Sequence, residues 1–168
     1  MRRFVFAALT CLLASTLNAQ NARFPMLTAD DLNGRSVTLP AQLPGEKTIV
    51  FIAYKQRQQA MINAWIDALG LDATRGAEFV ELPVVGSAAK AMRPIIDNGM
   101  RSGITDTAMR ARTITIYQNA SVVNNPLGFS GRGTIRVLVV RRDGTVLLST
   151  SGAVTADGVK AVQAAYQN

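Results

Sequence analysis

Histidine is absent from the sequence, and cysteine occurs only once, at Cys11 near the amino terminus. A single thiol cannot form an intramolecular disulfide, and without imidazole the chain lacks the side chain that ordinarily titrates near neutral pH. Catalytic triads of Ser, His and Asp, disulfide exchange within the chain, and metal centres built on His or on several Cys ligands are therefore excluded. We expect no cofactor, no metal site and no catalytic residue.

The amino-terminal residues have the pattern of a secretory signal peptide. Two arginines precede an apolar stretch, Phe4–Leu17, and Ala19 offers a small residue for cleavage, so residues 1–19 are predicted to be a signal peptide. The stretch of about 14 residues is short for a membrane span, but a retained amino-terminal anchor stays an alternative. Cleavage would remove Cys11 together with both arginines, so that the formal charge falls from +7 to +5. We therefore expect an exported protein, periplasmic or secreted.

A strand followed at once by a helix organises the rest of the chain, residues 20–168, which we expect to form one domain. Thr48–Ala53 is almost wholly apolar and predicts a buried strand. After the polar segment Tyr54–Gln59, apolar residues recur at helical spacing from Met61 to Leu69, and Gly70 stands where a helix C-cap belongs. This pairing is typical of a central strand in an α/β sheet.

The remaining segments predict further strands and helices in a definite order. Asn33-Gly34 is a hairpin signal, Pro94 should kink or restart a helix that begins at Ser87, and Asp143-Gly144 predicts a second hairpin. The other predicted elements are a strand at Glu78–Val85, a strand with one buried face at Arg112–Tyr117, an irregular crossover at Gln118–Arg132, strands at Thr134–Arg141 and Thr145–Ser149, and a helix at Thr155–Tyr166. We predict an α/β fold with a central mixed β-sheet, flanking helices and an N-terminal β-hairpin.

These features resemble those of thioredoxin-like proteins that have lost their redox centre, in particular the family of the mitochondrial ATP synthase assembly factor and its bacterial exported relatives. The resemblance is carried by Phe24–Leu27, Leu32–Gly34, Thr48–Ala53 with Trp65 in the following helix, Val137–Val146, Ser151–Ala153 and the final helix. It implies a thioredoxin-like fold and a chaperone-like role in assembling a membrane complex. Where thioredoxins carry a cis-proline, the resemblance places Arg136, and we expect an ordinary trans peptide bond there.

The junction between the organising strand and its helix is the candidate binding site. It comprises Tyr54, Lys55, Gln56 and Arg57, and the resemblance places Arg136 opposite them. Helix N-termini bind anions, so the cations could complete an anion site. Alternatively, both Lys55 and Arg57 are simply solvated. In the same helix, Trp65 is expected in the core, with an exposed recognition anchor as the alternative.

The basic excess is spread along the chain and indicates what the protein could bind. It lies mainly in Arg93, Arg101, Arg110, Arg112, Arg132, Arg136, Arg141 and Arg142. Export and the lack of interleaved aromatic residues argue against nucleic acid. Plain solvated charge is the first interpretation, and an acidic protein partner or an anionic membrane surface is the alternative to it.

Three hypotheses for function follow. The first is a non-enzymatic, redox-inactive module that binds a protein partner, such as a subunit of a membrane complex, in the cell envelope. The second is a module that binds a small anion at the strand–helix junction. The third is a weak enzyme that uses Tyr, Lys and carboxylate groups alone.

Overall fold

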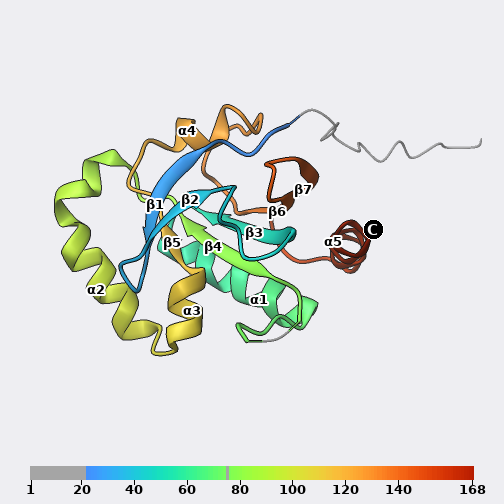
Figure 1. The fold of residues 1–168 in the computed structure, drawn as a ribbon, viewed down its shortest axis with the longest axis horizontal. Helices are drawn as coiled ribbons and strands as arrows, with labels where there is room; N and C mark the ends of the chain where they lie inside the picture. Colours follow the sequence, from blue (N-terminus) through green and yellow to red (C-terminus); the bar gives the residue numbers. More distant parts are fainter. Residues whose placement is uncertain (1–21, 75) are drawn as a thin grey trace, which may run out of the picture.

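The structure is a computed structural model that describes residues 22–74 and 76–168 (Figure 1). The predicted signal peptide therefore lies outside the described residues. The strands are β1 (Leu27–Asp31), β2 (Ser36–Leu39), β3 (Lys47–Ala53), β4 (Phe79–Pro83), β5 (Ile114–Thr115), β6 (Arg136–Arg141) and β7 (Val146–Ser151). The helices are η1 (Gln56–Gln58), α1 (Gln59–Leu69), η2 (Ser87–Met92), α2 (Arg93–Gly103), α3 (Thr107–Arg112), α4 (Ala120–Asn124) and α5 (Ala156–Gln167), where η denotes a 3₁₀-helix.

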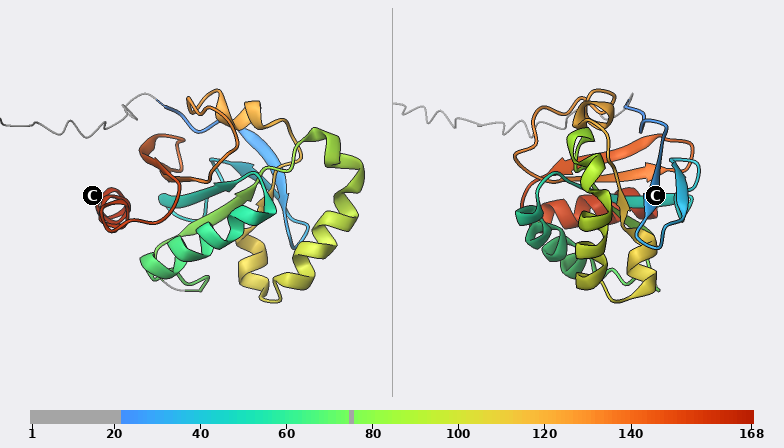
Figure 2. Two further views of the ribbon diagram at one scale, coloured as in Figure 1. Left: turned by 180° about the vertical axis from the view of Figure 1, so that it is seen from behind. Right: turned by 90° about the vertical axis from the view of Figure 1, so that its left-hand side faces the viewer.

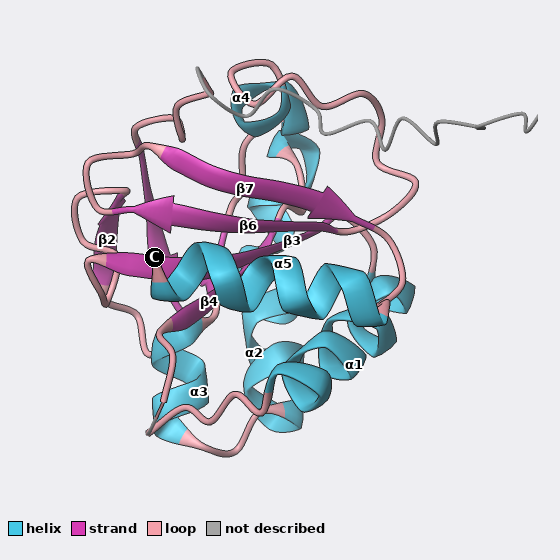
Figure 3. Ribbon diagram, turned by 90° about the vertical axis from the view of Figure 1, so that its right-hand side faces the viewer, coloured by secondary structure: helices cyan, strands magenta, loops and turns pink. Residues whose placement is uncertain are grey.

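The predicted central strand is β3, which lies inside a mixed four-stranded sheet of order β4-β3-β6-β7 (Figure 3). It pairs in parallel with β4 and antiparallel with β6, and every residue from Thr48 to Ala53 is buried. The strand carries apolar residues on both faces because both faces of the sheet are covered. The predicted mixed sheet is confirmed.

The Asn33-Gly34 signal forms the expected hairpin, in which β1 and β2 pair antiparallel from Leu27 opposite Leu39 to Asp30 opposite Ser36. On its other side β1 pairs with β5, giving a second sheet of order β2-β1-β5. Isolated bridges then link the β5 region to β4. The N-terminal hairpin is thus joined to the central sheet through β5.

Alternate residues of β3 point to two different cores. Val50 and Ile52 face the N-terminal hairpin and α4, whereas Ile49 and Phe51 face α1 and α5. Trp65 of α1 is 1% exposed in the second core, so the core interpretation of this residue is confirmed. The two helices lie side by side on this face of the sheet (Figure 3), whereas α2 lies at the opposite end of the molecule from α5 (Figure 2).

Two boundaries depend on proline and glycine. The helical segment that begins at Ser87 is divided into η2 and α2, with Pro94 in the first turn of α2, where its missing N–H costs no helical hydrogen bond. At the end of α1, Gly70 adopts the left-handed conformation (φ 62°) expected of a C-cap. Both positions agree with the sequence pattern.

One expectation about the strands is wrong. The alternation over Arg112–Tyr117 predicts a strand with one buried face, but all residues from Thr113 to Tyr117 are buried, and only Ile114–Thr115 form a strand. The reason is position, since Ile114 and Ile116 pack into the core that contains Val50, while Tyr117 on the other face lies against α2. None of the helices among the described residues is long and apolar enough to cross a membrane.

Candidate functional site

Tyr54, the first residue after β3, is fixed at both its backbone and its hydroxyl. Its N–H donates to Oε1 of Gln58 at 2.7 Å, and its hydroxyl donates to Oδ1 of Asn124 at 2.6 Å. Asn124 is itself buried at the end of α4 and donates from Nδ2 to the Gly131 carbonyl at 3.2 Å. These hydrogen bonds therefore hold the Tyr54 side chain in one position at the junction.

Gln58 is the residue of the junction that sequence reasoning missed. It is 1% exposed, because the η1 turn directs its side chain inward, and Nε2 donates to the Arg132 carbonyl at 3.1 Å. Since Oε1 already accepts from Tyr54, both polar ends of the amide are used. Gln58 thereby ties the end of β3 to the loop that precedes β6. In the sequence, Gln58 is a polar residue just before an amphipathic helix. Such a residue is as typical of an exposed side chain as of a buried one, so the sequence did not single it out.

Arg136 begins β6 next to this network, opposite Ile52 of β3. Its guanidinium lies over the Phe129 ring, with Cζ 4.7 Å from the centroid, and Nη2 donates to the Ser130 carbonyl at 2.8 Å. Nε is buried without a hydrogen-bond partner among the described residues. The peptide bond before Arg136 is trans, as expected, because the one cis bond among the described residues precedes Pro40.

Tyr54 and Arg136 interact electrostatically. Burial raises the pKa of the Tyr54 hydroxyl above its ordinary value, and the neighbouring positive charge of Arg136 acts in the opposite direction. The phenol is therefore neutral at physiological pH. It can serve as a hydrogen-bond donor and as a packing surface, but it does not provide a phenolate base.

The other three predicted residues lie in solvent. Lys55, Gln56 and Arg57 are exposed, and their side chains make no hydrogen bond or ion pair within the described part of the chain. No side chain caps η1 or α1. The structure thus brings Tyr54 and Arg136 together and leaves two cations and one amide exposed beside them.

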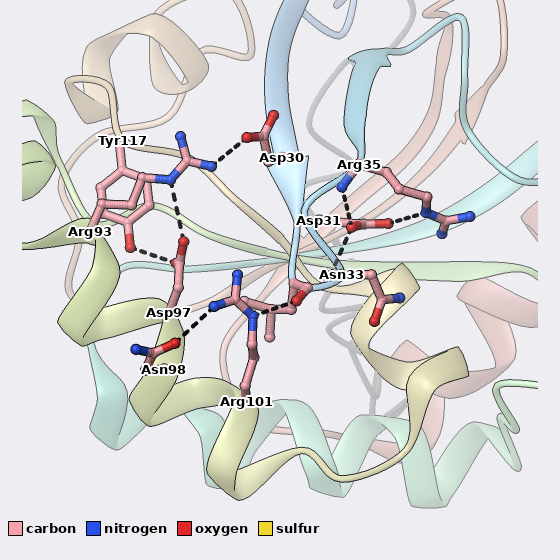
Figure 4. Close-up of polar contacts among 10 residues, drawn as sticks. Asp30, Asp31, Asn33, Arg35, Arg93, Asp97, Asn98, Arg101 and Tyr117 are labelled. Carbon is pink, nitrogen blue, oxygen red and sulfur yellow. Dashed lines mark hydrogen bonds and ion pairs between the residues drawn. The ribbon is translucent and has the colours of Figure 1, made fainter.

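A second polar cluster, not anticipated from the sequence, joins α2 to β1 and to the end of the β5 segment (Figure 4). Arg93 Nη2 lies 2.6 Å from Asp30 Oδ2, and its Nε lies 3.3 Å from Asp97 Oδ2. The Tyr117 hydroxyl donates to Asp97 Oδ1 at 2.7 Å, and the Arg93 guanidinium lies over the Tyr117 ring at 5.4 Å. Burial, together with the hydrogen bond to Asp97 and its charge, raises the pKa of Tyr117 well above its ordinary value.

The third feature is a buried carboxyl group beneath α1. Glu81 of β4 is 3% exposed, and its Oε2 accepts a hydrogen bond from Gln59 Nε2 at 2.8 Å. Burial raises the pKa of Glu81, and the hydrogen bond from Gln59 lowers it by less. Among the described residues no group of three or more acidic or cysteine side chains is arranged to hold a metal ion.

Comparison with known proteins identifies the fold. No family model and no curated protein sequence matches the chain. Among solved structures, the chain is similar to the exposed lipoprotein thioredoxin Etrx1 of Streptococcus pneumoniae, at 13% identity over 85% of this chain and 99% of that one, with a TM-score of 0.56. It is also similar to a thioredoxin-family thiol:disulfide interchange protein of Chlorobium tepidum, at 18% identity over 87% and 97% of the two chains, with a TM-score of 0.55.

A third similar structure is BsSco, described as a member of the Sco family of cytochrome c oxidase assembly proteins. It shares 13% identity over 88% of this chain and 95% of BsSco, with a TM-score of 0.56. Together these similarities show that the chain has a thioredoxin-like fold. At such identities they establish the fold and leave the activity open.

Proposed function

We propose that this protein is an exported, redox-inactive thioredoxin-like module that binds a protein partner in the cell envelope through the strand–helix junction. The observation that carries the proposal is the network at this junction. In thioredoxin-like proteins the position holds a reactive cysteine, whereas here Tyr54 and Gln58 fill it and use their polar atoms to hold β3, α4 and the loop before β6 together. No cysteine follows Cys11. The junction is therefore suited to binding and lacks the thiolate that redox chemistry requires.

An assembly role is the most specific form of this proposal. The resemblance to the ATP synthase assembly factor family suggests it, and the similar fold of BsSco, from a family of oxidase assembly proteins, is compatible with it. The excess of basic residues favours an acidic partner surface or an anionic membrane surface. On this proposal the protein acts as a binding or chaperone-like module and is not an enzyme.

Capture of a partner from cell-envelope extract tests the proposal. We expect the purified protein to retain a specific protein, and the double variant Lys55→Ala, Arg57→Ala to bind that protein about tenfold more weakly, or about 1.4 kcal/mol. The matched control is Arg141→Ala with Lys160→Ala, which also removes two exposed cations but lies away from the junction. Equal loss in both double variants would show a general charge effect and would contradict a binding role for the junction.

The redox part of the proposal has its own test. The purified protein should neither reduce the disulfides of insulin nor turn over peroxide, because no thiolate is present once the signal peptide is removed. Thiol-dependent turnover that copurifies with the protein through successive columns would contradict this part of the proposal and leave the binding part standing.

A second candidate function is small-anion binding at the same junction, and one observation favours it. Arg136 Nε is buried and has no hydrogen-bond partner among the described residues, while Lys55 and Arg57 are exposed in the segment that directly follows Tyr54. Titration with inorganic phosphate distinguishes the two candidates. Saturable binding that Arg136→Gln removes would favour the anion site, and absence of phosphate binding would leave the protein partner as the single candidate.

A further inference from the structure

The second feature that points to a ligand lies away from the junction, in the interface between α2 and the β1–β5 sheet. Asp30 and Thr115 are cross-strand partners, so their side chains stand on the same face, and alternation places Thr28 and Tyr117 on that face as well. The face that β1 and β5 present to α2 is therefore polar. Helices usually cover sheets with apolar contacts, so this interface needs another explanation.

Helix α2 also places a polar residue where an apolar one is usual, and apolar residues where polar ones are usual. Asp97 is the buried residue of α2, whereas Ile95 is 69% exposed and Met92, just before the helix, is 53% exposed. Three polar connections hold the helix in place, namely Arg93 to Asp30, Asp97 to the Tyr117 hydroxyl, and Arg101 to the Leu32 carbonyl just after β1 (Figure 4). These hydrogen bonds and ion pairs fix the position of α2 on the sheet. They do not fill the space between α2 and the sheet as packed apolar side chains would.

A cavity remains between the helix and the sheet. Its volume is about 180 Å³, and its walls include Thr28, Asp30, Lys90, Arg93, Thr115 and Tyr117. About six water molecules occupy such a volume in the liquid, so the cavity suits a ligand of similarly few heavy atoms. It is smaller than the pockets that accept drug-sized molecules.

One wall of the cavity carries an unpartnered hydroxyl group. Thr115 is 3% exposed, and its Oγ1 is buried without a hydrogen-bond partner among the described residues. A buried hydroxyl without a partner costs about 1–3 kcal/mol, and a ligand group would recover that cost once the Thr115 side chain turned its hydroxyl into the cavity. Because Thr115 stands on the same face as Asp30, its side chain is directed to the side on which α2 and the cavity lie.

The charged groups around the cavity have unused hydrogen-bonding capacity. Arg93 uses Nε and Nη2 for Asp97 and Asp30, which leaves Nη1 without a partner among the described residues, and Asp30 uses only Oδ2. Lys90 and Gln118 also line the cavity, and neither side chain has a hydrogen bond within the described ranges. Two cations, Lys90 and Arg93, and one carboxylate, Asp30, thus line the cavity, while the charges of Asp97 and Arg101 lie behind it next to Tyr117.

We propose that this cavity binds a small zwitterion of the α-amino-acid type. Lys90 and Nη1 of Arg93 would receive the carboxylate, Oδ1 of Asp30 would receive the ammonium group, and Thr115 would complete the polar contacts. A simple anion is disfavoured because it would lie close to the Asp30 carboxylate, and a simple cation is disfavoured because it would lie close to Lys90 and Arg93. The inference rests on the α2 interface alone and is independent of the function proposed for the strand–helix junction.

Titration of the ¹⁵N-labelled protein with glycine and L-alanine, followed by amide chemical shifts, tests the proposal. We expect saturable shifts confined to the segments that line the cavity, residues 28–30, 90–93 and 115–118. Acetate and methylammonium are the matched probes, because each carries one of the two charged groups. Both should bind at least about tenfold more weakly than glycine, since each forfeits a set of charge-assisted hydrogen bonds.

Two variants separate binding from a structural role. Lys90→Gln changes an exposed side chain and should weaken glycine binding about tenfold without altering the melting temperature, whereas Lys160→Gln, an exposed lysine on α5, should change neither. Thr115→Val removes the unpartnered hydroxyl and should weaken binding while leaving the protein folded. Absence of localised shifts up to ~10 mM ligand, or acetate binding as tightly as glycine, would overturn the proposal.

Discussion

The hydroxyl of Tyr54 and the side-chain carbonyl of Asn124 form a 2.6 Å hydrogen bond between residues 70 positions apart in the sequence. Tyr54 follows the central strand, and Asn124 ends α4. The bond therefore joins the organising strand–helix unit to the crossover that leads into β6. Because both residues also bind other groups of the junction, this contact links the two sides of the proposed binding site.

Replacing Tyr54 by Phe should destabilise the protein by about 1–3 kcal/mol, since Oδ1 of the buried Asn124 loses its donor. Asn124→Ala should cost a similar amount, and the double variant should cost less than the sum of the two. Urea unfolding of all four proteins in a double-mutant cycle measures the coupling. Strict additivity would mean that the hydrogen bond contributes nothing to stability.

The strand–helix unit could be predicted from the sequence because its signals are local. The apolar run of β3, the helical spacing of α1 and the glycine at its C-cap all lie within about two dozen consecutive residues, and the structure agrees with each of them. The same holds for the hairpin at Asn33-Gly34. Each of these elements is specified by residues that are close together in the sequence, so its pattern can be recognised without the structure.

The polar cluster at α2 could not be predicted in this way. Asp30, Arg93 and Tyr117 come from three distant segments, and each one alone is typical of a solvated surface. Their meeting depends on how α2 lies on the sheet, which no local pattern specifies. The buried Gln58 is similar, because its two partners lie 4 and 74 residues away. At Arg136 the resemblance indicated the position, but the contact with Phe129 is a tertiary feature.

The amino-terminal prediction concerns export. Mature protein recovered from outside the cytoplasm should begin near Gln20, because Ala19 is the small residue that follows the apolar stretch. Intact mass spectrometry of the recovered protein determines the cleavage site. A mass that still includes residues 1–19 would show a retained anchor, and it would also mean that Cys11 stays with the protein.

Packing of α5 on α1 leads to a prediction about two glycines. A Cβ added to Gly158 would lie 2.7 Å from Cη2 of Trp65 and 3.0 Å from Oγ1 of Thr155, so Gly158→Ala should destabilise the protein by about 1–3 kcal/mol. Gly99 is also helical, but apart from its chain neighbours and its own helix backbone nothing lies within 4 Å of an added Cβ, and Gly99→Ala should stabilise the protein by up to about 1 kcal/mol. Thermal unfolding of both variants gives the comparison. If both changed stability in the same direction, the helix contact at Trp65 would not be the cause.

Glu81 should make stability depend on pH in a direction that its burial determines. The pKa of this carboxyl is raised in the folded state, so folding opposes its ionisation. The free-energy cost of burying the ionised carboxylate is absent below the ordinary pKa of 4.5, and it is fully present above the folded-state pKa. Stability contributed by this group therefore falls as pH rises through that interval. Glu81→Gln removes the charge and keeps an oxygen that can accept from Gln59, so the variant should melt at a higher temperature than the wild type at neutral pH.

The difference between Glu81→Gln and the wild type should vanish below about pH 4, where both side chains are neutral. Glu46→Gln is the matched control, because Glu46 is exposed and its ion pair with Arg142 lies at the surface, so it should shift the melting temperature little at any pH. Melting curves recorded from pH 3.5 to 8 on the three proteins measure the effect. A Glu81→Gln variant that is less stable at neutral pH would mean that the ionised carboxylate is stabilised where it lies, and that burial is not the dominant influence on Glu81.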